Sequence, residues 1–265
     1  MASSNDSIKK TIIVAVALCL VCSIFVAGAA VGLKPIQQAN KDLDRKRNIL
    51  AAAQMLQPGE NVDAVFANVE KRLVNVSEGR FATDEELAAA GVSVDSYNQQ
   101  AASKDPALSV ALSGDKDPAS IKRRANFATV YVVKDDNAKA RIILPVHGYG
   151  LWSTMYGFMA LEGDFSTVVG FGFYQQAETP GLGGEVDNPA WKALWEGKEV
   201  YNEQGEAVLG LVKGSVDAND PQASHKVDGL SGATLTSRGV TNLVHYWLGE
   251  DGFGPFLAKL RSEGV

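Results

Sequence analysis

Residues 228–237 read DGLSGATLTS, a run of small side chains and hydroxyls that separates an expected strand from an expected helix. Val227 lies between polar neighbours and is suited to the end of a strand. After the run, apolar residues recur with helical spacing at Val240, Leu243, Val244, Trp247 and Leu248. This pattern predicts an amphipathic helix that begins near Thr234.

A helix start of this composition is suited to a phosphate group. The first N–H groups of a helix have no partner within it and carry the positive end of its dipole. Gly232 and Ala233 would let a phosphate approach the backbone, and the threonine hydroxyls would hydrogen-bond to it or be esterified by it. Ser and Thr are also the ordinary N-cap residues of helices that bind nothing. The residues alone leave both interpretations open and favour the N-cap.

The composition limits the classes of protein that the chain can belong to. With 265 residues, 46% of them hydrophobic, it can bury one sizeable core, as one domain or one domain with a helical lead-in. A net charge of −6 argues against nucleic acid as a partner. No Cys/His spacing suits zinc, no Gly-x-Ser-x-Gly accompanies the histidines, and no Gly-x-Gly-x-x-Gly indicates NAD binding by this chain. We therefore expect no metal site and no catalytic residue.

Residues 11–33 form an uncharged run that is long enough to cross a bilayer as a helix. Ala27-Gly28-Ala29 resembles a signal-peptide cleavage box, but the run is longer than the usual apolar region of a signal peptide. We therefore favour an uncleaved membrane anchor. Both cysteines, Cys19 and Cys22, lie in this run, where small thiols are expected to pack as apolar side chains.

The sequence predicts four regions: a tail over residues 1–10, a transmembrane helix over 11–33, a helical lead-in and linker over 34–120, and the main domain over 121–265. Helices are expected over 37–57 and 62–74, a capping box at Thr83–Glu86, and a polar linker over 97–120. Strands are expected over 127–133, 141–146, 155–161, 166–174 and 207–213, with a hairpin turn at Asp135–Asn137 and a short helix from Asn188. Runs of strands with helices at the ends indicate an α+β domain with a mixed or antiparallel sheet and flanking helices.

A second motif, QAETPGLGG, covers residues 176–184. Pro180 fixes a turn, and the glycines after it remove side chains so that a flat ring can lie on the backbone. Leu182 would cover one face of such a ring, and Glu178 and Thr179 would meet its edge. A plain glycine-rich turn explains the motif equally well. In the nearby segment HGYGLW, residues 147–152, Trp152 suits a core position as well as a ring contact.

The apolar N-terminal run, the Glu-Thr-Pro-Gly-Leu-Gly loop and the Asp-x-x-Ser-Gly-Ala-Thr motif together resemble the FMN-binding domain family. The resemblance covers most of the chain and rests on HGYGLWSTMYG, ETPGLGGE and HKVDGLSGATLTSRGV. The family includes flavin-carrying subunits of sodium-translocating NADH:quinone reductases and of Rnf-type electron-transport complexes. The insert over 58–120 and the Leu235-Thr236-Ser237 ending favour the reductase, with the Rnf-type protein as the alternative.

The resemblance implies that FMN is esterified through its phosphate to Thr234 by a flavin transferase, and that Asp228 belongs to the signature read during attachment. Thr236 would be a capping hydroxyl or a neighbour of the phosphate, and Lys213 would be a cation near the flavin or a solvated surface lysine. The implied cofactor-binding residues are Thr234, Glu178, Thr179, Leu182, Gly183, Ser231, Gly232, Ala233, Thr236, Trp152 and Lys213.

The resemblance further implies an electron carrier within a membrane-bound complex that moves electrons from NADH towards quinone and exports sodium. Its partners would be the other integral subunits of the complex. The large domain would lie on the periplasmic side of the bacterial inner membrane. The charges point the other way, because Lys34, Lys41, Arg45, Lys46 and Arg47 follow the span while only Lys9 and Lys10 precede it. We follow the resemblance. Two further alternatives are a membrane-anchored module that binds a flavin or phosphate non-covalently and, well below it, a hydrolase that uses Ser231 or Ser237.

Overall fold

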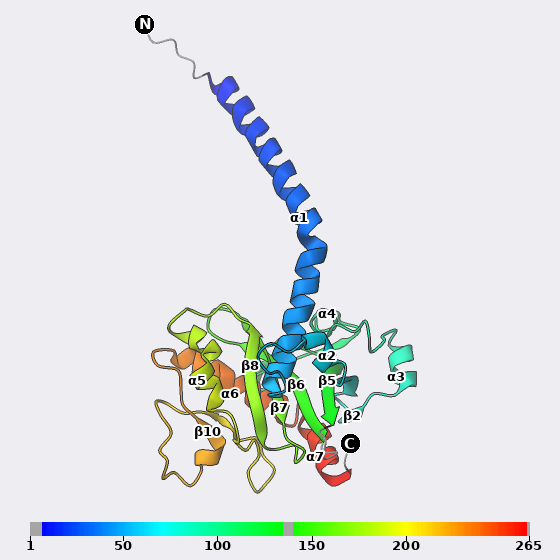
Figure 1. The fold of residues 1–265 in the computed structure, drawn as a ribbon, viewed down its shortest axis with the longest axis vertical. Coiled ribbons are helices and arrows are strands. Elements are labelled where there is room, and N and C mark those ends of the chain that lie inside the picture. Colours follow the sequence, from blue (N-terminus) through cyan, green and yellow to red (C-terminus); the bar gives the residue numbers. More distant parts are fainter. Residues whose placement is uncertain (1–6, 135–139, 264–265) are drawn as a thin grey trace. The chain divides into compact units, whose positions relative to one another are not determined.

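The computed structural model describes residues 7–134 and 140–263 (Figure 1). The chain divides into two compact units, Met1–Asp44 and Arg45–Val265, and helix α1 (Ile8–Ala52) contributes to both. The hairpin turn expected at Asp135–Asn137 lies outside the described residues.

The first unit consists, as far as it is described, of the long N-terminal part of α1. This helix is long and apolar enough to cross a membrane by its length and composition, and the residues of its most apolar stretch are all exposed. Cys19 and Cys22 are free thiols on its surface. Pro35 stands inside the helix, just after the uncharged run.

The second unit is built on a six-stranded antiparallel sheet. Its strands are β1 (Glu70–Asn75), β2 (Arg80–Phe81), β5 (Phe127–Lys134), β6 (Ala140–Tyr149), β7 (Thr154–Leu161) and β8 (Val168–Gln175), in the spatial order β2-β1-β5-β6-β7-β8. The last four follow one another in sequence and pair as neighbours. Strand β1 pairs with β5, where Leu73 lies opposite Thr129.

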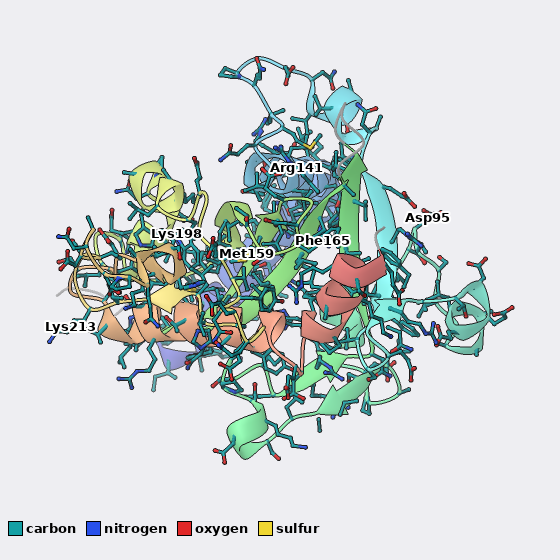
Figure 2. The ribbon with its side chains drawn as sticks, turned by 90° about the horizontal axis from the view of Figure 1, so that it is seen from below. Asp95, Arg141, Met159, Phe165, Lys198 and Lys213 are labelled. Atoms are coloured by element: carbon teal, nitrogen blue, oxygen red, sulfur yellow. The ribbon has the colours of Figure 1, made fainter. Side chains whose placement is uncertain are left out.

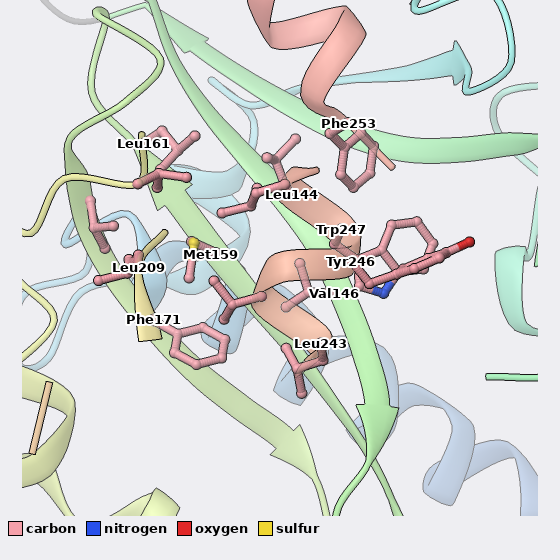
Figure 3. Packing of buried hydrophobic residues seen from close by; sticks show 14 of the residues in the cluster. Leu144, Val146, Met159, Leu161, Phe171, Leu209, Leu243, Tyr246, Trp247 and Phe253 are labelled. Carbon is pink, nitrogen blue, oxygen red and sulfur yellow. The ribbon is translucent and has the colours of Figure 1, made fainter. Parts of the chain in front are cut away.

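The two faces of this sheet bury different partners, because side chains alternate along each strand. In β6, Leu144 and Val146 belong to the large core that also contains helices α6 (Thr234–Leu248) and α7 (Gly254–Glu263). Figure 3 shows Leu243 and Trp247 of α6 among the side chains of this core. Ile143, the residue before Leu144, belongs to the opposite face, which packs against the end of α1.

Shorter elements complete the second unit. They are α2 (Val62–Phe66), α3 (Asp84–Ala89), α4 (Gln99–Ala102), β3 (Ser109–Ala111), η1 (Gly114–Lys116), β4 (Arg123–Ala125), η2 (Gly183–Asp187), α5 (Pro189–Ala193), β9 (Gly210–Leu211), η3 (Ala223–His225) and β10 (Lys226–Val227). Strand β10 pairs in parallel with β9 and leads through the DGLSGATLTS segment into α6. The capping box at Thr83–Glu86 is present at the start of α3.

The α+β prediction is confirmed, and the four strands expected between residues 127 and 174 correspond to β5–β8. The helix expected over 62–74 is wrong beyond Phe66, because Glu70–Asn75 pair with β5 as strand β1. The strand expected over 207–213 is reduced to β9. Residues 45–120, expected as a lead-in and linker, contribute β1–β3 and α2–α4 to the same compact unit as the main sheet.

Candidate functional site

Three segments that are far apart in sequence meet at one buried carboxylate, that of Glu178. The segments are the turn between β6 and β7, the loop after β8, and the first turn of α6. The Glu178 carboxylate accepts hydrogen bonds from the backbone N–H groups of Leu151 at 3.1 Å, Trp152 at 3.0 Å and Ser153 at 3.3 Å. It also accepts one from the Thr236 hydroxyl at 2.7 Å. Only 5% of Glu178 is exposed, so its partners are these protein groups.

The donors around Glu178 favour the charged carboxylate. Burial by itself raises the pKa of this group, but the Thr236 hydroxyl and the backbone N–H groups outweigh burial, and the pKa lies below its ordinary value. Glu178 is therefore an anion at neutral pH, held in place by hydrogen bonds rather than by a basic side chain.

Two glycines of the motifs make room for this carboxylate. A Cβ atom at Gly150 would lie 2.6 Å from Glu178 Oε1, and one at Gly183 would lie 2.6 Å from Thr236 Oγ1. Neither separation is compatible with an ordinary contact. A third glycine, Gly239, lets α6 pack against the turn, because its Cβ would lie 2.5 Å from the carbonyl oxygen of Tyr149. The glycines thus bring the three segments close together.

The N-terminus of α6 carries an exposed hydroxyl. Thr234 is the first residue of the helix and is exposed, and the N-cap residue Ala233 makes no side-chain capping hydrogen bond. The Ser237 hydroxyl instead accepts the N–H of Leu230 at 3.0 Å, within the preceding loop. The N-cap interpretation of the Ser and Thr residues is therefore wrong. The helix start presents the Thr234 hydroxyl beside the positive end of the helix dipole.

An open groove of about 800 Å³ runs beside Thr234. Its lining includes Lys213, Ser231, Gly232, Thr234 and Arg238. Figure 2 shows the Lys213 side chain at the rim of the molecule, reaching away from the ribbon. Lys213 and Arg238 form no salt bridge within the described part of the chain. The groove therefore combines two cationic side chains with the start of a helix.

Asp228 holds one wall of this groove together. Its carboxylate accepts the N–H of Val216 at 2.8 Å, and its carbonyl oxygen accepts the indole N–H of Trp191 at 3.0 Å. Next to it, Gly229 lies so close to the loop after β9 that a Cβ there would overlap the carbonyl oxygen of Val212. Asp228 thus fixes the loop that leads to Thr234.

Several exposed apolar side chains lie next to the Glu178 cluster and the groove. Trp152 is 66% exposed, so its interpretation as a core residue is wrong. Leu182 is 43% exposed and lies next to Gly232, where a Cβ would be 3.0 Å from its Cδ2. Tyr149, Leu151 and Leu235 are also exposed. Exposed apolar side chains at one junction are typical of a binding surface rather than of an inert one.

The structure brings the predicted residues into two adjoining groups. Glu178, Gly183 and Thr236 belong to the buried cluster, whereas Ser231, Gly232, Thr234 and Lys213 line the groove. Thr179 is exposed in its loop, and its carbonyl oxygen accepts the N–H groups of Leu182 and Gly184. Ala233 is buried as the N-cap residue. The ring contacts assigned to Glu178, Thr179, Leu182, Gly183 and Trp152 stay predictions.

Sequence reasoning missed Arg238, which lines the groove one helical turn after Thr234. The i, i+4 spacing from Thr234 is a signal that would have found it, because residues four apart share a helix face. Tyr149, Leu151 and Leu235 were missed as well, since nothing local in the sequence distinguishes an exposed from a buried apolar residue in a turn or at the end of a strand or helix.

His147 is packed among aromatic rings. Burial lowers the pKa of His147 to about 4, and its ring stacks on that of Tyr156. The His147 carbonyl oxygen accepts the indole N–H of Trp247 at 2.7 Å. In the described ranges, no three His, Cys, Asp or Glu residues come together as a metal site.

Comparisons with known proteins agree on one family. The model of the FMN-binding domain matches residues 150–249. The chain is 52% identical to the C subunit of the Na(+)-translocating NADH-quinone reductase of Pseudomonas aeruginosa, over 98% of each chain. It is 48% identical to the protein of the same name from Yersinia pestis, over 98% of this chain and 95% of that one.

Solved structures match the same fold. NqrC from Shewanella oneidensis is 36% identical, with a TM-score of 0.74 over 84% of this chain and 100% of that chain. The C subunit of the Na(+)-translocating NADH-quinone reductase of Parabacteroides distasonis is 24% identical, with a TM-score of 0.63 over 85% of this chain and 96% of that one, and supports the fold alone.

Proposed function

Because the chain belongs to the family of Na(+)-translocating NADH-quinone reductase C subunits, we propose that it is an electron-carrier subunit that holds FMN covalently on Thr234. It acts as a subunit of the sodium-translocating oxidoreductase rather than as a catalyst alone. The complex carries electrons from NADH to quinone and exports sodium. FMN supplies the redox chemistry, while the chain supplies attachment, orientation and electrostatics.

The residues around Thr234 fit the phosphate of FMN. The Thr234 hydroxyl is exposed at a helix start without a side-chain cap, so its neighbouring N–H groups are available to a phosphate. Lys213 and Arg238 line the same groove and would offset the charge of a phosphodiester. Gly232 has a φ of +70° and carries no side chain, which leaves space above the loop.

The residues next to the groove fit a flat ring. Leu182 and Trp152 present exposed apolar surface, and the glycine-rich loop that carries Leu182 presents backbone. Thr179 and Gly183 would flank the ring, and Ser231, Gly232 and Ala233 would lie along the phosphate. A covalent link keeps the flavin bound although the site is open, which suits a carrier that must face its redox partners.

The partners follow from the same assignment. The other integral subunits of the reductase would be permanent partners, and a flavin transferase would be a transient one that esterifies Thr234. The relatives match over nearly their whole length and are named as C subunits of the reductase, which favours the reductase over the Rnf-type alternative.

Helix α1 would anchor the chain in the bacterial inner membrane as a single span, with the large domain in the periplasm. The family assignment supports this orientation, whereas the basic residues after the span oppose it. The orientation is therefore tested separately from the flavin.

The observation that carries the proposal is the exposed Thr234 hydroxyl at the uncapped start of α6, beside two cationic side chains. The test is flavin fluorescence in a denaturing gel, with the full chain co-expressed with a flavin transferase. Wild type and Thr236→Ala should give a fluorescent band, and Thr234→Ala should give none. Thr236 is the matched control, because it is the other threonine of the segment and is buried.

Two results would contradict the proposal. A fluorescent band in Thr234→Ala would place the link elsewhere. A dark wild-type band, with the transferase active on a known substrate, would leave a membrane-anchored module that binds its flavin or phosphate ligand without a covalent bond.

A further inference from the structure

Among the described residues, the Glu178 carboxylate forms no hydrogen bond with Thr234, so a phosphate on Thr234 does not by itself account for the buried cluster around Glu178. Burying a carboxylate is costly unless it is fully hydrogen-bonded, and here backbone and hydroxyl donors surround it. The chain also keeps Gly150 and Gly183 at positions where any side chain would displace the carboxylate or its threonine partner.

The partners of Glu178 lie on two separate parts of the site. On one side are the N–H groups of Leu151, Trp152 and Ser153, in the turn that carries the exposed Trp152. On the other side is Thr236, two residues after Thr234 in the first turn of α6. Glu178 itself lies in the loop that carries Leu182. One carboxylate thus joins the attachment residue to the apolar side chains beside it.

The Ser153 hydroxyl adds two hydrogen bonds to this connection. The Ser153 hydroxyl donates to Glu178 Oε1 at 3.5 Å and accepts the N–H of Ala177 at 2.8 Å, so the turn and the loop are bonded to each other as well as to the carboxylate. The N–H of Glu178 is bonded to the side chain of Gln176 at 2.6 Å. Glu178 is therefore fixed along its backbone and at its head group.

We propose that Glu178 is a positioning residue of the flavin site, which holds the Trp152 turn and the start of α6 in one fixed arrangement around the FMN on Thr234. The proposal rests on the proposed function and assigns Glu178 a role through other residues rather than a contact with the ring. It also has an electrostatic consequence. Reduction adds negative charge to a flavin, so a fixed anion close by lowers its midpoint potential.

The experiment uses the full chain in membranes or detergent, with Glu178→Gln as the test and Glu185→Gln as the matched control. Gln has the shape of Glu but places an NH₂ donor against N–H groups. Glu185 lies in the same loop, and its carboxylate accepts only the Asn188 side chain among the hydrogen bonds of the described residues, so the control removes one charge without touching the turn or α6.

Two quantities are measured. In chain expressed without the transferase, amide hydrogen exchange of residues 150–153 should speed up about tenfold or more in Glu178→Gln, since hydrogen bonds to a charged group are lost. In flavinylated chain, the FMN midpoint potential should rise in Glu178→Gln. In Glu185→Gln the exchange rate should stay at the wild-type value, and the potential should rise less than in Glu178→Gln, because solvent screens the charge of the partly exposed Glu185.

Wild-type exchange together with a wild-type potential in Glu178→Gln would overturn the proposal. If Glu178→Gln does not fold, Thr236→Val removes only the hydroxyl bond, and the first turn of α6 should then exchange faster; unchanged exchange there would also overturn it. A wild type without covalent flavin would refute the proposed function, while the exchange measurement would still decide whether Glu178 holds the turn.

Discussion

Replacing Gly150 by alanine tests the packing around Glu178 with a single methyl group. The new Cβ would lie 2.6 Å from Glu178 Oε1 and 3.1 Å from Met155 Sδ. Gly150 has no positive φ, so the backbone accepts alanine and the effect comes from the contact alone. The carboxylate would have to move by roughly 0.5–1 Å to restore an ordinary separation.

That displacement lengthens the hydrogen bonds that Oε1 accepts, which measure 3.0 Å from Trp152 and 3.3 Å from Ser153. Hydrogen bonds to a charged group contribute roughly 1.5–3 kcal/mol each, and part of the loss is recovered when neighbours shift. We therefore expect Gly150→Ala to lower the free energy of unfolding by about 2–4 kcal/mol. For a domain of this size that is a fall in Tm of roughly 5–15 °C.

The assay is thermal unfolding of the full chain in detergent, followed by tryptophan fluorescence, with Gly172→Ala as the control. Gly172 also lacks a positive φ, but a Cβ there would meet the Lys192 side chain at an ordinary 3.5 Å. The control should stay within about 0.5 kcal/mol of wild type. Equal Tm values for wild type, Gly150→Ala and Gly172→Ala would refute this prediction, because they would show that the Glu178 carboxylate accommodates a methyl group at position 150 without losing its hydrogen bonds.

Three further predictions concern other parts of the chain. Burial lowers the pKa of His147 to about 4, so the folded state binds a proton there less readily than the unfolded state, and the free energy of unfolding should fall as the pH drops from about 6.5 to about 4. In His147→Gln the free energy of unfolding should depend less steeply on pH over that range. An equally steep dependence would exclude His147 as the cause. Arg238→Gln removes a cation from the groove beside Thr234, so a redox titration should give a lower FMN midpoint potential than in wild type. An unchanged midpoint potential would place Arg238 too far from the flavin to affect it. The periplasmic location of the large domain predicts that, with Cys19 and Cys22 changed to serine, a single cysteine introduced at the exposed Ser262 reacts with an impermeant maleimide in cells whose outer membrane has been opened. Labelling only after cell lysis would place the domain in the cytoplasm.

Periodicity predicted the elements whose burial is decided locally. The five apolar residues spaced along α6, from Val240 to Leu248, are all fully buried, and the apolar run of β6 is shared between the two cores, with Leu144 in one and Ile143 in the other. Periodicity failed at residues 62–74, where Val62, Val65, Phe66, Val69 and Leu73 have helical spacing. Pairing of Glu70–Asn75 with β5, more than fifty residues later, decides the structure there, and no local pattern contains that information.

The features of the site also differ in how far the local sequence predicts them. The position of Thr234 at the start of a helix was predictable because its motif is contiguous and the helix behind it follows from local spacing. The role of Glu178 was not predictable, because its partners at Leu151 and Thr236 come from segments 27 and 58 residues away. Arg238 was missed although its i, i+4 spacing from Thr234 places both residues on one face of α6.

The two edges of the central sheet bear on how the chain assembles with other proteins. At one edge, β2 has only two residues, and Arg80 forms a 2.7 Å ion pair with Glu86. At the other edge, the start of β8 is occupied by the chain itself, since Val168 exchanges backbone hydrogen bonds with Gly197 and Lys198. An open edge strand invites another chain to extend the sheet, whereas short, charged or covered edges prevent this. We therefore expect neighbouring subunits to dock on loops and side chains, and the isolated chain to resist edge-to-edge aggregation.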